Sequence, residues 1–97
     1  MELGLEKKSV VVTAASSGLG FSIAKMFANE GATVTLSGRN PEKVDLAVQR
    51  LREEATGVVE GCVCDVTSAE QSTAMIREIS KKHGIDVLVA NSAGAAT

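Results

Sequence analysis

The sequence predicts an α/β fold: a doubly wound parallel sheet with the element order β-α-β-α-β-α-β and the strand order 3-2-1-4. Apolar runs of strand length alternate with amphipathic runs of helical length, which is typical of parallel sheets with right-handed crossovers. Only 2% of the 97 residues are aromatic, and none is Tyr or Trp. The core must therefore come from Val, Leu, Ile, Ala and Met, which suits buried parallel strands. The length fits one domain, residues 1–97.

The first helix is predicted at residues 19–29, between the first two of four strands. It is expected to turn Ile23, Met26 and Phe27 toward the core and to end at Gly31. The strands are apolar or β-branched runs bounded by turn residues. Their predicted ranges are residues 9–13, 33–37, 58–64 and 85–90.

The second helix has a clear start signal. Asn40 is a good N-cap and Pro41 fits the first helical position. The helix is expected to end at Thr56 and Gly57. Its apolar residues recur at helical spacing and predict a single buried face, made of Val44, Ala47, Val48 and Leu51.

The third helix is predicted to begin with a capping box at "TSAE", in which Glu70 bonds back to the cap. Met75, Ile76 and Ile79 are expected to face the core. Lys81, Lys82 and His83 suit the negative end of the helix dipole, and Gly84 ends the helix. The single histidine is therefore interpreted as part of a helix terminus rather than as a catalytic group.

Composition argues against several functions. A net charge of −2 gives no basic field for nucleic acid or anionic lipid. No apolar stretch approaches the roughly 20 residues that span a bilayer, and the start lacks the pattern of a secretory signal. The two cysteines lack C-x-x-C spacing and extra ligands, so no metal site is expected. These features predict a reduced, cytoplasmic protein.

Two loops are expected to meet at the point where the winding of the sheet reverses. "TAASSGLG" (residues 13–20) follows the first strand, and "NSAG" (residues 91–94) follows the fourth. Gly18 and Gly20 allow close approach of the backbone, and the helix start offers free N–H groups to a diphosphate. The alternative is a tight strand-to-helix turn in which glycine only provides steric room.

These motifs together resemble the short-chain dehydrogenase/reductase family. Residues 13–20 are similar to its Thr-Gly-x-x-x-Gly-x-Gly motif, with Ala14 where Gly is usual. Residues 91–94 are similar to its Asn-Asn-Ala-Gly motif, with Ser92 for the second Asn, and Asp65 follows the third strand. The resemblance spans nearly the whole chain, is greatest to 3-oxoacyl-carrier-protein reductases, and implies a partial Rossmann fold.

The resemblance also implies a cofactor site, in which Asp65 contacts the adenine. Ala14 adds a methyl group where the cofactor approaches the backbone closely. The residues implied to bind the cofactor are Thr13, Ala14, Ser16, Ser17, Gly18, Leu19, Gly20, Arg39, Asn40, Asp65, Val66, Asn91, Ala93 and Gly94.

The end of the second strand predicts which cofactor is preferred. Family members that prefer NAD carry Asp there, whereas this sequence has Gly38, Arg39 and Asn40. Arg39 is always charged and can hold a phosphate with two hydrogen bonds. NADP is therefore expected ahead of NAD. The alternative is that Arg39 only faces solvent beside the helix.

The catalytic groups of the family, a Tyr-x-x-x-Lys pair and a Ser, lie beyond the Asn-Asn-Ala-Gly motif. This chain stops at Thr97 and contains no Tyr, so no catalytic residue is assigned. Three hypotheses follow. The chain is a truncated reductase relative that is inactive alone, or half of a split enzyme completed by a chain carrying Tyr and Lys, or a non-catalytic nucleotide-binding or oligomerising module.

The assembly state follows from the surface that this half-fold leaves uncovered. A fourth strand at the edge of the sheet carries unpaired backbone groups and apolar side chains. Symmetric self-association would cover them. We therefore expect a homo-oligomer whose interface includes the fourth strand or the third helix.

Overall fold

Four strands form one parallel sheet in the order β3-β2-β1-β4, as predicted. The computed structural model describes residues 6–91. The strands are β1 (Ser9–Val12), β2 (Thr33–Gly38), β3 (Val59–Val63) and β4 (Val87–Val89), each shorter than or within one residue of its prediction. Val10 lies opposite Val34 of β2 on one side and Val87 of β4 on the other, so β1 is paired along both of its edges.

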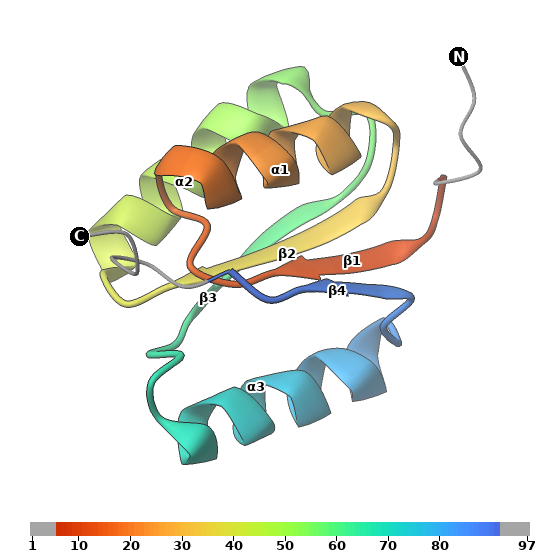
Figure 1. The fold of residues 1–97 in the computed structure, drawn as a ribbon. Helices are drawn as coiled ribbons and strands as arrows, with labels where there is room; N and C mark the ends of the chain where they lie inside the picture. Colours follow the sequence, from red (N-terminus) through yellow and green to blue (C-terminus); the bar gives the residue numbers. More distant parts are fainter. Residues whose placement is uncertain (1–5, 92–97) are drawn as a thin grey trace.

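Helices cover both faces of the sheet (Figure 1). α1 (Gly18–Asn29) and α2 (Pro41–Glu54) lie on one face, and α3 (Ala69–Lys82) is the one helix of residues 6–91 on the other. Successive crossovers of one hand place the first two helices together, and the reversal of winding after β3 places the third opposite them. All four strands end on the same side of the molecule, where α1 and α3 begin.

The two faces of the sheet carry cores of different size. The face under α1 and α2 is wholly apolar, because side chains of β1 and β2 such as Val12 and Leu36 pack against both helices. The face under α3 has a small cluster of four buried residues, Val11, Cys64, Met75 and Ile79. The hydroxyls of Ser9 and Thr35 are also buried, without a hydrogen-bond partner among the described residues. α3 is therefore the least firmly packed of the three helices.

The predicted inward face of α1 is partly wrong. The buried residues of α1 are Gly20, Ala24 and Ala28, whereas Met26 is 56% exposed. Ile23 and Phe27 are partly buried at the edge of the core. Small residues spaced by four allow the helix to approach the sheet closely, which moves the larger side chains to its flanks. The predicted end is confirmed, because Gly31 follows the C-cap with a φ of +87°.

The start and the buried face of α2 are as predicted. Asn40 Oδ1 accepts hydrogen bonds from the backbone N–H groups of Glu42 and Lys43. The predicted buried face, Val44, Ala47, Val48 and Leu51, is confirmed.

The N-cap of α3 is Ser68, one residue later than the predicted capping box. Ser68 Oγ accepts from the N–H of Gln71 at 3.2 Å. Thr67 is unavailable as a cap because both its N–H and its hydroxyl donate to Asp65 Oδ1, at 2.9 and 2.6 Å. Glu70 consequently lies at the second helical position and does not complete a capping box.

His83 ends α3 but does more than cap it. Its backbone N–H donates to the carbonyl of Ile79, as a C-cap does. Its ring Nε2 lies 2.7 Å from Glu60 Oε1 on β3, and Lys82 Nζ lies 2.9 Å from Glu60 Oε2. The end of the helix is thus tied to the sheet by a charged cluster, which the sequence did not predict. No helix within residues 6–91 is long and apolar enough to cross a membrane.

Candidate functional site

The loop after β1 crosses the carboxyl edge of the sheet between two neighbouring strands. The N–H of Thr13 donates to the carbonyl of Val89 on β4 at 3.1 Å, which extends the β1–β4 pairing. Two residues later the N–H of Ala15 donates to the carbonyl of Ser37 on β2 at 2.7 Å. The loop therefore turns from one neighbour to the other at the reversal of winding, where ligands bind in doubly wound sheets.

Asn91 holds this loop through three hydrogen bonds. Thr13 Oγ1 donates to the carbonyl of Asn91 at 2.7 Å and accepts from its N–H at 2.8 Å. The side-chain amide of Asn91 donates to the carbonyl of Ala14 at 3.1 Å. Thr13 and Asn91 were predicted to bind the cofactor, and the structure shows both engaged in hydrogen bonds that fix the shape of the loop.

Ala14 adopts a backbone conformation that favours glycine. Its φ is +50°, in the left-handed region, where a Cβ atom costs roughly 1–2 kcal/mol. Its N–H faces the hydroxyl of Ser37 at 3.4 Å, and its carbonyl accepts from Asn91. These contacts from β2 and β4 over-determine the conformation, so the loop keeps its glycine-like shape despite the methyl group.

The start of α1 leaves backbone donors available. Its N-cap Ser17 makes no side-chain hydrogen bond to the helix, and no acidic residue occupies the first turn. Gly20 packs directly on the loop, since a Cβ there would lie 2.5 Å from the carbonyl oxygen of Ala14. The free N–H groups and the positive end of the helix dipole suit a diphosphate, and the absent Cβ keeps the helix against the loop. The residues present therefore fit this part of a dinucleotide.

The end of β2 forms the second wall of the site. Gly38 is buried, and a Cβ there would lie 3.1 Å from Ser16 Oγ, so the first loop and the end of β2 are in close contact. Arg39 and Asn40 follow on the surface. Asn40 Oδ1 is occupied in capping α2, and Arg39 is the exposed positive charge at this strand end. A group that binds beyond Gly38 would therefore meet the charge of Arg39.

Asp65 lies at the end of β3. Hydrogen bonds from the hydroxyl and N–H of Thr67 lower the pKa of Asp65, and the positive charge of Arg39 lowers it further. The N–H of Asp65 donates to the side chain of Gln71 at 2.9 Å. An ionised carboxylate is thus held at the carboxyl edge, within the electrostatic reach of Arg39.

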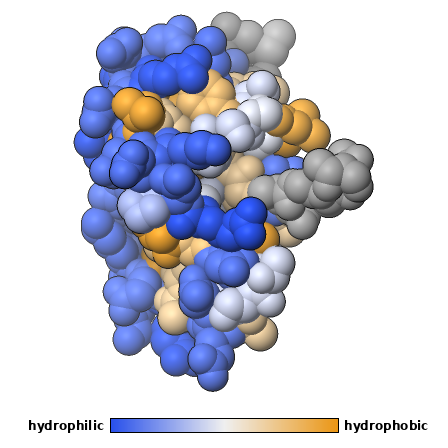
Figure 2. Space-filling model, turned by 90° about the vertical axis from the view of Figure 1, so that its left-hand side faces the viewer, coloured by the Kyte–Doolittle hydropathy of each residue, from blue (hydrophilic) through white to orange (hydrophobic). Residues whose placement is uncertain are grey.

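The described site residues follow the carboxyl ends of the parallel strands or begin α1, so they lie at one end of the sheet. Figure 2 shows the molecule from this side. Ser16 and Val66 are half-buried, while Ser17, Gly18 and Leu19 are exposed at the start of α1. Ala93 and Gly94 lie outside the described residues. Within residues 6–91 no group of three or more His, Cys, Asp or Glu side chains could hold a metal ion.

Sequence reasoning missed Ser37. Its carbonyl and hydroxyl both face the first loop, and its side chain is fully buried. The available signal was a small polar residue at the end of an otherwise apolar buried strand, where a hydroxyl needs a partner.

A parallel sheet in the order 3-2-1-4, with a glycine-containing loop and a bare helix start at its switch point, defines a Rossmann-like α/β domain. The model of the short-chain dehydrogenase family matches residues 8–97. The chain therefore belongs to the short-chain dehydrogenase/reductase family.

Individual relatives agree with this membership. The chain is 43% identical over 91 residues to an uncharacterised oxidoreductase of Staphylococcus saprophyticus, covering 93% of this chain and 38% of that protein. It is 43% identical over 90 residues to dehydrogenase/reductase SDR family member 4 of Mus musculus, covering 92% of this chain and 32% of that protein.

The fold is also that of a solved reductase. The structure of L-sorbose reductase from Gluconobacter frateurii, in complex with NADPH and L-sorbose, matches with a TM-score of 0.88 and 33% identity. The match covers 95% of this chain and 35% of that one. The chain thus spans roughly a third of the length of these relatives.

Proposed function

We propose that this chain is the dinucleotide-binding part of an NADP-dependent oxidoreductase, forming one domain over residues 1–97. The observation that carries the proposal is the end of β2, where Gly38 is followed by Arg39. The side chain of Arg39 is exposed and takes no part in capping α2. No carboxylate occupies Gly38 or the two positions after it. Arg39 would pair with a 2′-phosphate, whereas an acid in its place would repel that phosphate.

The central diphosphate of the cofactor would lie over the first loop. Backbone N–H groups at Gly18 and Leu19 would receive the diphosphate, and the Thr13–Asn91 hydrogen bonds would keep the loop in place beneath it. When bound, the nicotinamide would supply or accept a hydride. The role of this chain's own residues is to bind and orient the cofactor.

The 97 residues alone are proposed to bind without catalysing carbonyl reduction. They contain no Tyr, and the lone histidine pairs with Glu60 rather than facing the first loop. The resemblance to 3-oxoacyl-carrier-protein reductases and the cytoplasmic setting remain predictions, as does a second chain that would supply Tyr and Lys.

The test is a titration of the purified chain with NADP⁺ and NAD⁺ by calorimetry. We expect high-micromolar affinity for NADP⁺, about −5 to −6 kcal/mol, and weaker binding of NAD⁺. Arg39→Ala should weaken NADP⁺ binding about tenfold, which is about 1.4 kcal/mol, and leave NAD⁺ binding nearly unchanged. The control is Lys8→Ala. Lys8 is an exposed charge just before the amino end of β1, so it lies at the opposite end of the sheet from Arg39.

Equal affinity for the two dinucleotides would contradict the role of Arg39. If Arg39→Ala and Lys8→Ala weaken the affinity for NADP⁺ equally, then Arg39 acts only through its long-range charge and not by direct contact with the phosphate. Absence of binding to either cofactor would contradict the proposal as a whole.

A further inference from the structure

A polar cavity of about 320 Å³ lies between α3 and the sheet on the side of β3. Its volume is near the lower end of the roughly 300–1,000 Å³ that small-molecule pockets span. Four elements contribute side chains: Thr35 comes from β2, Glu60 from β3, Arg52 from α2, and Glu78 and Lys82 from α3. The fold therefore brings polar groups together here from segments far apart in the chain.

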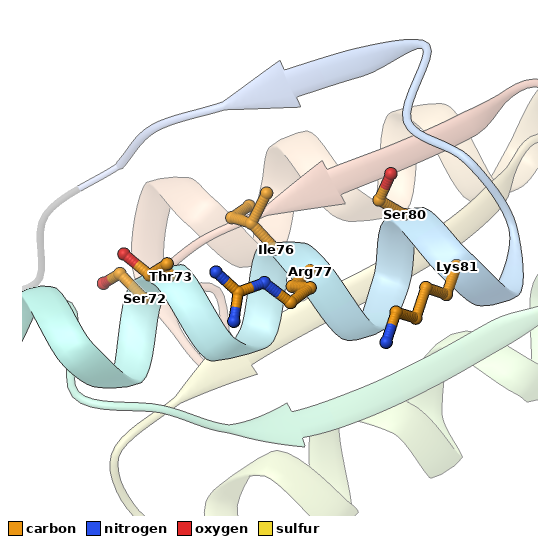
Figure 3. Close-up of a pocket in the computed structure, with 6 residues that line it drawn as sticks. All are labelled: Ser72, Thr73, Ile76, Arg77, Ser80 and Lys81. Atoms are coloured by element: carbon orange, nitrogen blue, oxygen red, sulfur yellow. The ribbon is translucent and has the colours of Figure 1, made fainter.

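The groove on the other flank of α3 is built differently. All six side chains that Figure 3 shows along it come from α3 itself: Ser72, Thr73, Ile76, Arg77, Ser80 and Lys81. One helix presents these groups side by side, whereas a ligand site needs groups that converge from several elements. Only the β3-side cavity of the two has that construction.

The cavity is remote from the first loop. Glu60 is the second residue of β3, and Lys82 is the last residue of α3. The strands run toward the first loop and α3 runs back from that end of the sheet (Figure 1). The cavity thus lies toward the amino ends of the strands, and a function for it goes beyond the proposed binding of a dinucleotide.

A buried hydroxyl lines the inner side of the cavity. Thr35 is 4% exposed, and its Oγ1 has no hydrogen-bond partner within residues 6–91. Thr35 is opposite Val11 on β1 and Glu60 on β3, which places it on the face of the sheet that α3 covers. A buried hydroxyl without a partner is unfavourable. A ligand that reaches this depth would supply the missing partner.

The charged groups of the cavity balance one another. Glu60 pairs with Lys82 Nζ at 2.9 Å and with the ring of His83 at 2.7 Å. Arg52 and Glu78 are exposed and form no ion pair within the described part of the chain. Apart from His83, the lining carries two positive and two negative side chains. A ligand with charge of one sign would be attracted by half of them and repelled by the other half, whereas a zwitterion can satisfy both.

Arg52 and Glu78 approach the cavity from different elements. Arg52 Nε donates to the carbonyl of Val59 at 2.9 Å, which holds the guanidinium at the start of β3. Its two terminal nitrogens can still hold a carboxylate with two hydrogen bonds. Glu78 lies four residues before Lys82, so both side chains are on the same side of α3. The cavity therefore has a cation on its sheet side and an anion on its helix side.

We infer that this cavity binds a small zwitterion, of the class of α-amino acids with a short hydroxylated side chain. The carboxylate of the ligand pairs with Arg52 and its ammonium group with Glu78. Its hydroxyl bonds to Thr35, which gives the buried Oγ1 a partner. The small volume of the cavity limits the ligand to a short side chain.

The test is a titration of the ¹⁵N-labelled chain with L-serine, followed by the NMR signals of its backbone amides. We expect saturable shifts at residues around the cavity, with millimolar affinity. Three probes each lack one group of L-serine: ethanolamine lacks the carboxylate, 3-hydroxypropionate the ammonium, and L-alanine the hydroxyl. Each should bind several-fold more weakly, because each leaves one partner on the protein unused.

Each deletion on the ligand has a matching substitution on the protein. Arg52→Gln should abolish the preference for L-serine over ethanolamine, and Glu78→Gln the preference over 3-hydroxypropionate. Thr35→Val should make L-serine and L-alanine equal. It should not lower the free energy of unfolding without ligand, because it removes a hydroxyl that has no partner. Arg77→Gln, in the groove of Figure 3, is the control and should keep all three preferences.

Absence of saturable shifts with L-serine would overturn the inference. So would equal binding of ethanolamine or 3-hydroxypropionate, or preferences that the matching substitutions leave intact. Glycerol binding as tightly as L-serine would also overturn it, in favour of a neutral polyol. NADP⁺ affinity is measured on the same variants and should be unchanged. Loss of L-serine binding with NADP⁺ binding retained separates this cavity from the proposed cofactor site.

Discussion

At the scale of single residues, the site depends on a few polar atoms that are committed to the loop rather than offered to a ligand. Thr13 and Asn91 are 78 positions apart and exchange hydrogen bonds in both directions. Together with the buried Ser37 they fix a loop whose second residue, Ala14, has a left-handed backbone. The shape of the loop therefore depends on how well these contacts hold one strained position.

Ala14→Gly is expected to stabilise the protein. Removing the methyl group relieves roughly 1–2 kcal/mol of backbone strain, and the greater freedom of glycine in the unfolded chain offsets about 0.4–1 kcal/mol of this. The net gain should be about 0.5–1 kcal/mol in the free energy of unfolding, measured by urea denaturation. NADP⁺ affinity should also rise, since the cofactor approaches a barer backbone.

The matched control is Ala15→Gly, at a buried neighbour whose φ is not positive. That change removes a packed methyl group and should destabilise the protein. If Ala14→Gly lowers the free energy of unfolding as much as Ala15→Gly does, then the backbone of Ala14 is not strained.

At the scale of elements, α3 differs from α1 and α2 in how it is held. Two buried side chains, Met75 and Ile79, attach it to the sheet. Its carboxyl end is attached by Glu60 on β3, which accepts a hydrogen bond from Lys82 at 2.9 Å and contacts the ring of His83 at 2.7 Å. A helix with so few buried residues relies on this charged cluster more than a well-packed helix would.

The Glu60 cluster makes stability depend on pH in the acidic range. The hydrogen bond from His83, followed by that from Lys82, lowers the pKa of Glu60 below its usual 4.5. Because the folded-state pKa is the lower one, the stabilisation is fully present above the unfolded pKa and is lost as the pH falls through the folded value. Glu60→Gln should cost about 0.5–1 kcal/mol at neutral pH, as expected for a partly exposed ion pair.

The measurement is the free energy of unfolding of both proteins between about pH 3 and 7. The difference between them should shrink as the pH falls below 4.5. Glu53→Gln, at an exposed position on α2, should show no such convergence with the wild type. A constant difference across the range would argue against the cluster as its source.

At the scale of the whole molecule, the fold brings the loops of the candidate site together at one end of the sheet. The carboxyl ends of the strands carry the glycine-containing loop, Arg39 and Asp65. The chain spans roughly a third of its relatives, and α3 is the one helix of residues 6–91 on its face of the sheet (Figure 1).

The 97-residue chain should not oxidise NADPH with any carbonyl substrate. Hydride transfer to a ketone develops negative charge on oxygen, and that charge needs a positioned proton donor. The sequence holds no Tyr, and the ring of its one histidine lies against Glu60. The assay follows NADPH absorbance over a panel of ketones and aldehydes, with L-sorbose reductase and L-sorbose as the positive control.

Turnover that scales with the concentration of the chain, and that persists after a further purification step, would contradict this expectation. It would require a proton donor elsewhere on the chain.

The sequence by itself determined the order of elements, the strand order 3-2-1-4 and the buried face of α2. These properties follow from short-range signals: hydrophobic periodicity, caps, and glycine at a strand-to-helix turn. Each signal lies within about twenty residues, and the handedness of crossovers converts them into one topology.

Only the tertiary structure decided which atoms are free at the site. In the sequence, three polar loop residues look equally available to a ligand: Thr13, Asn91 and Asn40. In the structure, an oxygen or amide group of each is already hydrogen-bonded to another part of the protein. The close approach of α1 to the sheet exposed Met26, and the pairing of Thr67 with Asp65 moved the cap of α3 to Ser68. Such choices depend on distances between segments far apart in the chain, and local patterns carry no information about those distances.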